Sequence, residues 1–324
     1  MRINQAKGYI SVIVAALLWA SSGTAGKVLF EAGISPLDLV RIRVTCSALI
    51  LAVIFGIFHR HLLRLRRRDI LYFILFGGVA MTLVQVSYFF AISKIQVAAA
   101  ILLQYLAPIL VAIFSMCFWN EKVTGVKLLA LFLAMAGCYL VVGGYNMELL
   151  ALNREGILWG LVSAVCFASC TLLGERGMHH YPPWTVIFYA FLFASVSLNI
   201  AADPETVFRG GYTPLQWLNF FYIVVFGTIV AFWFYYTGIN TIRATRAIIT
   251  ATLEPISAAL MAFVVLGEIM SPLQILGGTL VVTAIILLQL QREHDVLAPA
   301  LIRSRNMGSE DTATMHKRIE KLPE

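Results

Sequence analysis

Hydrophobic positions along this chain fall into long unbroken runs that are separated by short polar gaps. Ten runs are long enough for a helix that crosses a bilayer, which takes about 20 apolar residues at a rise of about 1.5 Å each. They lie at 8–26, 36–58, 70–91, 96–118, 124–143, 156–174, 183–201, 215–238, 244–266 and 272–290. The pattern predicts an all-α membrane protein of ten transmembrane helices. From residue 291 to 324 it stops, which predicts a disordered or loosely helical cytoplasmic tail.

The two halves of the apolar pattern repeat each other. When the second half is shifted back by 147 residues, Pro255 falls on Pro108 and Glu268 falls on Glu121. A shared register over several helices indicates an internal repeat, here 8–143 and 156–290. Each copy has five spans, an odd number, so the second copy enters the membrane from the opposite side. Inverted repeats are typical of secondary transporters, whose site lies near the midplane between the copies.

Composition supports a lipid environment. Hydrophobic residues make up 60% of the 324 positions and charged residues only 13%, which excludes an ordinary soluble domain. The net charge of +7 resides in the gaps rather than on one face, so we expect the lipid bilayer and not a nucleic acid as partner. With a cytoplasmic N-terminus, eighteen lysines and arginines fall on the cytoplasmic side and four on the other. We therefore predict an inner-membrane protein with both termini cytoplasmic.

Motifs for cofactor chemistry are missing from the sequence. Cys166 and Cys170 lie one turn apart, but no histidine or further cysteine completes a metal set, so we expect no metal and no cofactor. The segment 23–27 has neither the spacing nor the Ser or Thr of a phosphate loop. No nucleophile and base converge at helical spacing either. We predict a protein that is not an enzyme and that uses a gradient as its source of energy.

Two segments carry a resemblance to a known family. Ala107-Pro108-Ile109 to Asn120-Glu121-Lys122, and Leu253-Glu254-Pro255 to Leu266-Gly267-Glu268, resemble the two EamA domains of the drug/metabolite transporter superfamily. The match covers about residues 8–290. The resemblance implies a ten-helix exporter of amino acids, related metabolites or drugs, often working against a proton gradient. Arg43 corresponds to an arginine that the family often has in helix 2, whereas the second copy has Ala190 there.

Four residues of the repeated motif are candidates for kinks or gates. Pro108 and Pro255 each kink a fourth helix, and Glu121 and Glu268 each close one at the membrane edge. The alternative for the glutamates is a role in the fold, as carboxylates that cap the next helix. Because each copy has one in the equivalent place, we favour the fold role.

The substrate cavity is expected between the copies, lined by polar and aromatic groups of central helices. The candidates are Trp19, Arg43, Gln85, Tyr88, Gln104, Tyr105, Trp233, Tyr236 and Glu254. Aromatic residues in such helices are more often packing residues. The amides of Gln85 and Gln104 need a partner in hydrocarbon. For Arg41 and Arg43 we favour snorkelling to the interface over the alternative that Arg43 binds a substrate carboxylate.

Glu254 is the strongest single candidate. It lies near the centre of the ninth helix, where a charge costs about 2.5–3.5 kcal/mol, so we expect a protonated carboxyl that faces the interior. Pro255 cannot donate to the Ala251 carbonyl, which is left open to another partner. Glu254 is expected either to couple or gate transport, or to donate to that carbonyl. The first copy has Ala107 in this place, so the fold itself does not demand a carboxylate.

From these features we predict a proton-coupled secondary transporter that exports small metabolites such as amino acids or drugs. A facilitator or importer of the same substrates is the closest alternative. A non-transporting membrane protein, either an intramembrane enzyme or a structural partner, is the second alternative. Small-molecule substrates and protons are the expected ligands, and the sequence leaves monomer and homodimer open.

Overall fold

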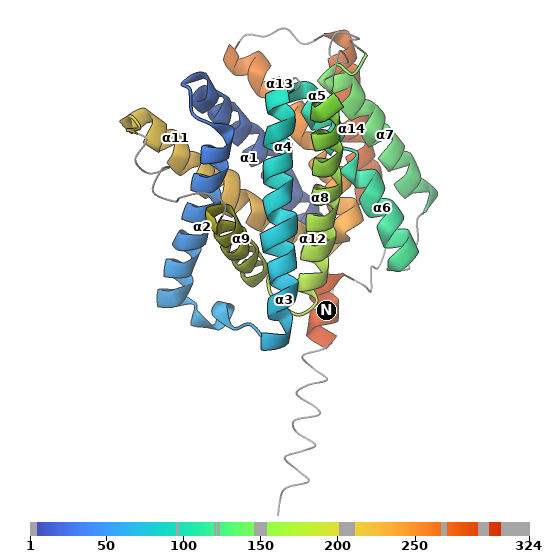
Figure 1. The fold of residues 1–324 in the computed structure, drawn as a ribbon. Coiled ribbons are helices and arrows are strands. Elements are labelled where there is room, and N and C mark those ends of the chain that lie inside the picture. Colours follow the sequence, from blue (N-terminus) through green and yellow to red (C-terminus); the bar gives the residue numbers. More distant parts are fainter. Residues whose placement is uncertain are drawn as a thin grey trace, which may run out of the picture.

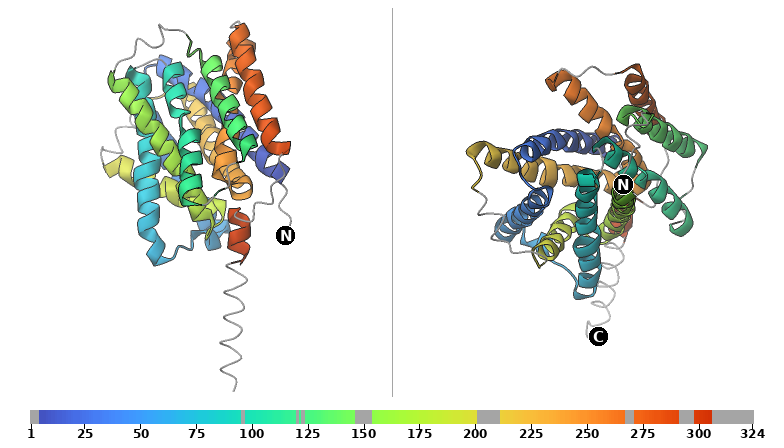
Figure 2. Two further views of the ribbon diagram at one scale, coloured as in Figure 1. Left: turned by 90° about the vertical axis from the view of Figure 1, so that its right-hand side faces the viewer. Right: turned by 45° about the horizontal axis from the view of Figure 1, so that its top comes forward.

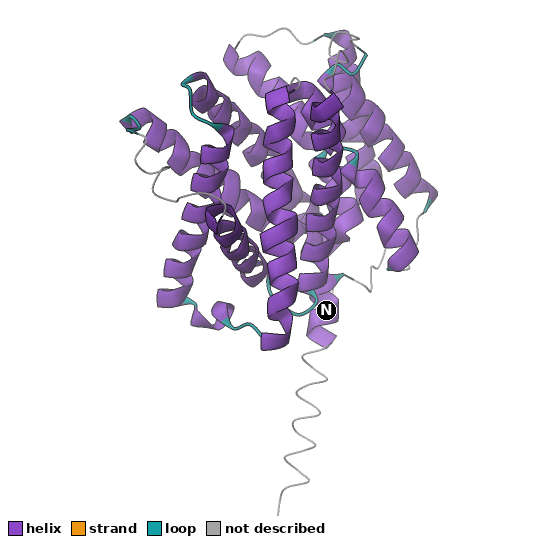
Figure 3. Cartoon of the chain, viewed as in Figure 1, coloured by secondary structure: helices purple, strands orange, loops and turns teal. Residues whose placement is uncertain are grey.

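The chain folds into a bundle of helices that lie side by side (Figure 1). A computed structural model describes residues 5–94, 97–119, 121, 124–145, 154–200, 211–266, 271–290 and 298–305. Over these residues the secondary structure is almost entirely helical, with no strand (Figure 3). The elements are α1 (Gln5–Glu31), α2 (Pro36–Phe58), η1 (Arg60–Leu63), η2 (Arg67–Asp69), α3 (Ile70–Phe73), η3 (Ile74–Met81), α4 (Thr82–Lys94), α5 (Val97–Gln104), α6 (Ala107–Phe118), α7 (Gly125–Val142), α8 (Arg154–Met178), α9 (Pro183–Ile200), α11 (Pro214–Val224), η5 (Val225–Val230), α12 (Ala231–Ala251), α13 (Leu253–Leu266) and α14 (Pro272–Leu290).

Nine helices in the described part of the chain are long and apolar enough to cross a membrane. Large apolar side chains are exposed on the outside of the bundle, among them Phe118, Phe132 and Ile200. Such a surface suits hydrocarbon and would be unusual in water. The protein is therefore a multi-pass membrane protein.

The fourth predicted span is broken in its middle. Helix α5 ends at Gln104, the chain turns at Tyr105 and Leu106, and α6 begins one residue before Pro108. The second half has the same feature, with a turn at Thr252 between α12 and α13. Both prolines lie just after the turn, where a missing N–H and the fixed φ angle interrupt the helical hydrogen bonds. The turns at Tyr105 and Thr252 are 147 positions apart, which is the offset of the sequence repeat.

The eighth and ninth predicted spans are joined differently from the sequence prediction. We expected a gap at 239–243, but α12 continues through it, and only Arg243 leaves the helical conformation, at φ 68° and ψ 168°. Arg243 and Arg246, which we counted among the cytoplasmic charges, are buried in the bundle. The predicted gap at 239–243 is wrong, because carboxylates from other helices meet Arg243 inside the protein.

Close helix packing relies on glycine. A Cβ atom at Gly137 in α7 would lie 2.6 Å from the Gly277 carbonyl oxygen in α14, and the reverse distance is the same. The two helices therefore approach backbone to backbone. The third span of each half also contains a π-helical stretch, η3 in the first and η5 in the second.

The loops before α3 and α9 and the short helix at 299–305 meet at one end of the bundle. The N-terminus of the chain lies at the same end (Figure 2). The Tyr181 hydroxyl accepts a hydrogen bond from the Arg66 amide, and the Tyr181 carbonyl accepts one from Arg303. Arg303 also donates to Asn240 at 3.2 Å. Residues 299–305 of the predicted tail are helical. The remainder of 291–324, apart from Ala298, lies outside the described residues.

Candidate functional site

The two mid-span helix breaks contact each other. The Tyr105 hydroxyl oxygen, at the break of the first half, lies 3.0 Å from the Ala251 carbonyl oxygen and 2.7 Å from Glu254 Oε2. Glu254 is in the first turn of α13, where a carboxylate is favoured by the helix dipole. Donation from Glu254 to the Ala251 carbonyl was one of our two alternatives, and in the structure that carbonyl is bonded by Tyr105 from the other half.

Arg43 faces the interior of the bundle. Its Nε donates to Thr228 Oγ1 at 3.0 Å, and its Nη2 donates to the Gly227 carbonyl at 3.3 Å. Both acceptors belong to the π-helical stretch η5. The expectation that Arg43 snorkels to the interface is wrong, because these acceptors hold its guanidinium inside the protein. Arg41 is also buried, with Asp38 at 4.0 Å.

Electrostatic interactions join Arg43 to two further candidates. Its guanidinium interacts with both Glu254 and Tyr88, and Tyr88 in turn interacts with Glu254. We call Arg43, Tyr88, Tyr105 and Glu254 the mid-span cluster. It combines one cation, one carboxyl group and two phenols at the junction of the two halves, which is chemistry suited to a polar ligand with an acidic group.

Aromatic rings border the mid-span cluster. Tyr105 packs edge-on against Phe167 with a centroid distance of 6.4 Å, and Trp19 lies at the same distance from Phe167. Trp19 also contacts Tyr235 at 5.0 Å. The predicted cavity residue Trp19 thus reaches the cluster through Phe167.

The other predicted cavity residues have separate partners. Gln104 donates to Ser163 Oγ at 2.9 Å, so its amide has the partner that hydrocarbon demands. Trp233 stacks on Trp184 with a centroid distance of 5.1 Å. Tyr236 is buried and donates to the Cys170 carbonyl, and Gln85 is buried in α4. These contacts do not by themselves join the four residues to the mid-span cluster.

A cavity of about 390 Å³ opens on a different part of the bundle. Its lining is apolar and comes from α5, from the turn between α5 and α6, and from α7. The lining residues are Leu102, Leu103, Leu106, Phe132, Met135, Ala136 and Tyr139. Phe132 is exposed on the outer surface. None of the nine predicted cavity residues lines this space.

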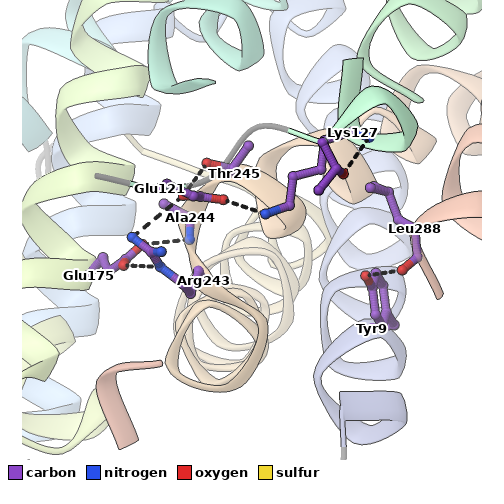
Figure 4. Close-up of polar contacts among 9 residues, drawn as sticks. Tyr9, Glu121, Lys127, Glu175, Arg243, Ala244, Thr245 and Leu288 are labelled. Atoms are coloured by element: carbon purple, nitrogen blue, oxygen red, sulfur yellow. Dashed lines mark hydrogen bonds and ion pairs between the residues drawn. The ribbon is translucent and has the colours of Figure 1, made fainter. Parts of the chain in front are cut away.

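A second polar group, which we call the ion cluster, lies near the beginning of α1, where Gly8 packs against Thr241 of α12. Figure 4 shows its contacts. Its centre is Glu121, whose Oε1 accepts from Lys127 Nζ at 3.2 Å and whose Oε2 accepts from Thr245 at 2.9 Å. Arg243 Nη2 lies 3.5 Å from the same Oε2. Glu121 and Lys127 come from the first half, whereas Thr245 and Arg243 come from the second.

Glu175 completes the ion cluster from α8. Its Oε1 accepts from Arg243 Nε at 3.1 Å, and its Oε2 accepts from the Ala244 amide at 2.6 Å. The carboxylate therefore binds the backbone directly after the extended residue and compensates the guanidinium charge. Both carboxylates and both cations are buried, with side-chain exposures of 1–3%.

The capping alternative for Glu121 is wrong. Helix α7 is capped by Thr124, whose side chain accepts from the Lys127 amide, while Glu121 bonds side chains of the other half. The equivalent residue Glu268 lies outside the described residues.

His179 follows α8 at the same end of the bundle and packs near Trp119. Burial, with the charges of His180 and Arg243, lowers the pKa of His179 to about 4. The imidazole is therefore neutral at physiological pH and adds no charge beside the ion cluster.

The sequence interpretation missed three members of the ion cluster. Lys127 and Arg243 were counted only among the cytoplasmic charges, and Glu175 was not considered. The sequence carries no clear signal for Glu175, which directly follows the apolar run 156–174 and is next to Arg176. Among the residues that the structure describes, no group of three or more His, Cys, Asp or Glu side chains is placed to hold a metal.

The sequence and the fold of this chain are similar to those of known transport proteins. The model of the EamA-like transporter family matches residues 6–143 and 154–290. The uncharacterized inner membrane transporter YicL of Salmonella typhimurium is 31% identical over 292 residues, which cover 88% of this chain and 95% of that protein. The riboflavin transporter ImpX of Fusobacterium nucleatum is 27% identical over 294 residues, covering 87% and 97%. One solved crystal structure, 18% identical, shares the fold with a TM-score of 0.69 and covers 88% of this chain and 97% of its own. Since the family model matches most of the sequence, the chain belongs to the EamA-like transporter family.

Proposed function

We propose that this protein is a proton-coupled secondary transporter that exports small polar metabolites, with ten spans in two inverted halves and both termini in the cytoplasm. The observation that carries the proposal is the contact between the two helix breaks at Tyr105 and Glu254. Broken helices whose ends meet between two repeats are a typical substrate and coupling-ion site in secondary transporters.

The geometry at Arg243 supports the proposed count of ten spans. The helical stretch Pro214–Ala251 has 38 residues and is one of the nine candidate spans. At 1.5 Å per residue it is about 57 Å long, almost twice the hydrocarbon thickness of about 30 Å. The extended conformation of Arg243 divides it. Its second piece continues into α13, so that residues 244–266 form a ninth span and α14 the tenth.

Three features support two inverted halves. The family model matches two segments of nearly equal length. The turns at Tyr105 and Thr252 keep the repeat offset, and each half has a π-helical stretch in its third span. With five spans in each half, as proposed, the second half would enter the membrane from the opposite side.

The number of hydrogens at Tyr105 supports proton coupling. A phenol has one hydrogen to donate, yet two acceptor groups lie within 3.0 Å of its oxygen. When Glu254 is protonated, its carboxyl donates to Tyr105, and Tyr105 donates to the Ala251 carbonyl. When Glu254 is ionised, Tyr105 turns to the carboxylate and the carbonyl loses its partner. The protonation state of Glu254 thereby changes a contact between the halves.

The ion cluster serves as a closed gate at the cytoplasmic end. It joins Glu121 and Lys127 of the first half to Arg243 of the second, inside the protein. Access from the cytoplasm requires these groups to part, which agrees with the gate role that we considered for Glu121. Alternating access then exchanges a state closed here for one closed at the other end.

The mid-span cluster favours substrates with an acidic group. Arg43 offers a planar fork that matches a carboxylate, and Glu254 lies within its electrostatic range. Amino acids and related drugs fit this chemistry. Riboflavin, named as the substrate of the Fusobacterium relative, is a second compound to test, because the rings of Trp19 and Phe167 border the cluster.

The test is transport into everted vesicles with and without a pH gradient, using a panel of labelled amino acids and riboflavin. Glu254→Gln keeps the shape and the donor of a protonated carboxyl but removes titration. We expect it to lose stimulation by the gradient while substrate exchange persists, and we expect Tyr105→Phe to weaken the same stimulation. Glu155→Gln, an exposed carboxylate outside both clusters, is the matched control.

Three results would contradict parts of the proposal. Full gradient dependence in a normally inserted Glu254→Gln variant would refute coupling through this residue. Wild-type flux that is unchanged when the gradient is collapsed would indicate a facilitator. Accumulation only in right-side-out vesicles would indicate an importer.

A further inference from the structure

An arginine-rich segment lies between α2 and α3, at the end of the bundle that holds the N-terminus (Figure 1). We call residues 59–69 the arginine loop. It has a single acidic residue, Asp69, against five arginines: Arg60, Arg64, Arg66, Arg67 and Arg68. None of these residues belongs to the mid-span cluster or to the ion cluster.

The arginine loop has a fixed structure. Its leucines point inward, and Leu62 is only 7% exposed. Thr185 in α9 donates to the Leu62 carbonyl at 2.9 Å, and Tyr189 donates to the Leu63 carbonyl at 2.7 Å. The two short 3-10 helices η1 and η2 shape the backbone between these anchors. Hydrogen bonds from another helix thus hold the loop against the bundle.

This arrangement directs the arginine side chains outward. All five are exposed, and the side chain of Arg68 reaches 71% even with Asp69 at 4.0 Å. Arg60 donates to the Gly56 carbonyl at the end of α2, which keeps it next to the membrane-spanning part of that helix. The positive charge therefore lies on one side of a folded loop, and the apolar residues lie on the other.

Exposed apolar side chains lie directly beside this charge. Phe58, the last residue of α2, is 72% exposed, and Leu71, in the first turn of α3, is exposed as well. Since α2 and α3 bound the loop on both sides, its arginines are at the level where hydrocarbon gives way to headgroups. A ligand that satisfies both surfaces has an anionic head and an apolar tail.

We propose that the arginine loop is a binding surface for anionic phospholipid headgroups. Arginine forks bind phosphate oxygens in pairs, and several arginines held at fixed positions lose less freedom on binding than a flexible loop would. Membrane topology needs only the charge of these residues, and a solvated loop supplies it equally well. The hydrogen bonds from Thr185 and Tyr189 add something that topology does not need, because they hold the loop in one position. The surface is independent of the transport mechanism.

The experiment measures thermal unfolding of the full-length protein in detergent during titration with phosphatidylglycerol or phosphatidylcholine. Arg64 and Arg67 are the residues to change, because both are exposed and lie between the anchors. One basic residue near an anionic surface contributes roughly a fivefold change in affinity. We expect the double variant Arg64→Gln/Arg67→Gln to bind phosphatidylglycerol with an affinity about 25-fold lower, measured from the lipid concentration that gives half of the stabilisation. The double variant Arg64→Lys/Arg67→Lys should retain most of the affinity for phosphatidylglycerol. The matched control Arg154→Gln should bind this lipid as the wild type does.

The expected pattern is stabilisation by phosphatidylglycerol that falls with salt and is absent with phosphatidylcholine. Equal stabilisation by both lipids, or an unchanged affinity in the double glutamine variant, would overturn the proposal. Stabilisation by inorganic phosphate as strong as that by the lipid would also overturn it, since the site would then belong to a soluble anion. An alkaline phosphatase fusion after residue 69 checks that the variant keeps its topology, and the lipid titration is made on variants that pass this check.

Discussion

The backbone at Arg243 predicts that glycine is more stable than alanine at this position, which is the reverse of the usual order in a helix. Its φ of 68° and ψ of 168° belong to a region that is populated almost only by glycine. The side chain is held there by Glu175 at 3.1 Å and by Glu121 at 3.5 Å. Arg243→Gly and Arg243→Ala both remove these ion pairs, but only the glycine variant relieves the backbone.

The magnitudes separate the two effects. Loss of one partner from a buried ion cluster lowers the free energy of unfolding by about 3–5 kcal/mol, and this part is common to both variants. A side chain in this conformation costs about 1–3 kcal/mol, which glycine recovers. Glycine also lowers the free energy of unfolding by about 0.4–1 kcal/mol relative to alanine, because it makes the unfolded chain more flexible. We expect the glycine variant to be more stable than the alanine variant by about 0.5–2 kcal/mol.

The assay is unfolding by SDS titration of both variants in the same detergent. Arg176 provides the matched control, because it is exposed and lies in the regular helix α8. There the order should reverse, with alanine more stable than glycine by about 1 kcal/mol. If alanine is as stable as glycine at position 243, the extended residue is unstrained and the division of α12 at this point loses its physical basis.

Two further predictions concern packing and topology. Gly137→Ala should lower the free energy of unfolding by about 1–3 kcal/mol, because the new methyl group meets the Gly277 carbonyl in α14. Gly125→Ala, where nothing lies within 4 Å, should leave it unchanged or raise it by up to about 1 kcal/mol, and a similar loss in both variants would argue against close contact of α7 and α14. Alkaline phosphatase fused after Arg68 should be inactive and fused after Tyr145 active, and the opposite pattern would reverse the proposed orientation.

The sequence predicted the positions of the spans well because hydrophobic length is a local property. The run at 36–58 is α2 to the residue, and Pro36 together with the polar residue His59 explains both ends. The proline motif also pointed to the helix breaks near Tyr105 and Thr252. These features depend only on neighbours along the chain, which the sequence displays directly.

The polar contacts were less accessible because they join residues far apart in sequence. The partner of the Ala251 carbonyl is Tyr105, 146 positions away, and Pro255 indicated only that a partner was needed. Arg43 was assigned to the interface because snorkelling is the common fate of an arginine near a helix end. Its acceptors lie in η5, in the other half, and nothing near Arg43 in sequence identifies them.

The ion cluster has a consequence for how its two sides separate. Lys127 and Glu121 form a pair within the first half, at 3.2 Å, and Arg243 and Glu175 form a pair within the second, at 3.1 Å. Each half therefore contributes one cation and one carboxylate to the ion cluster, and the ion pair that crosses between the halves is the longest of the three, at 3.5 Å. If the proposed gate opens between the halves, each of these four side chains keeps an ionic partner from its own half. The large desolvation cost of a buried unpaired ion is then avoided for all four groups.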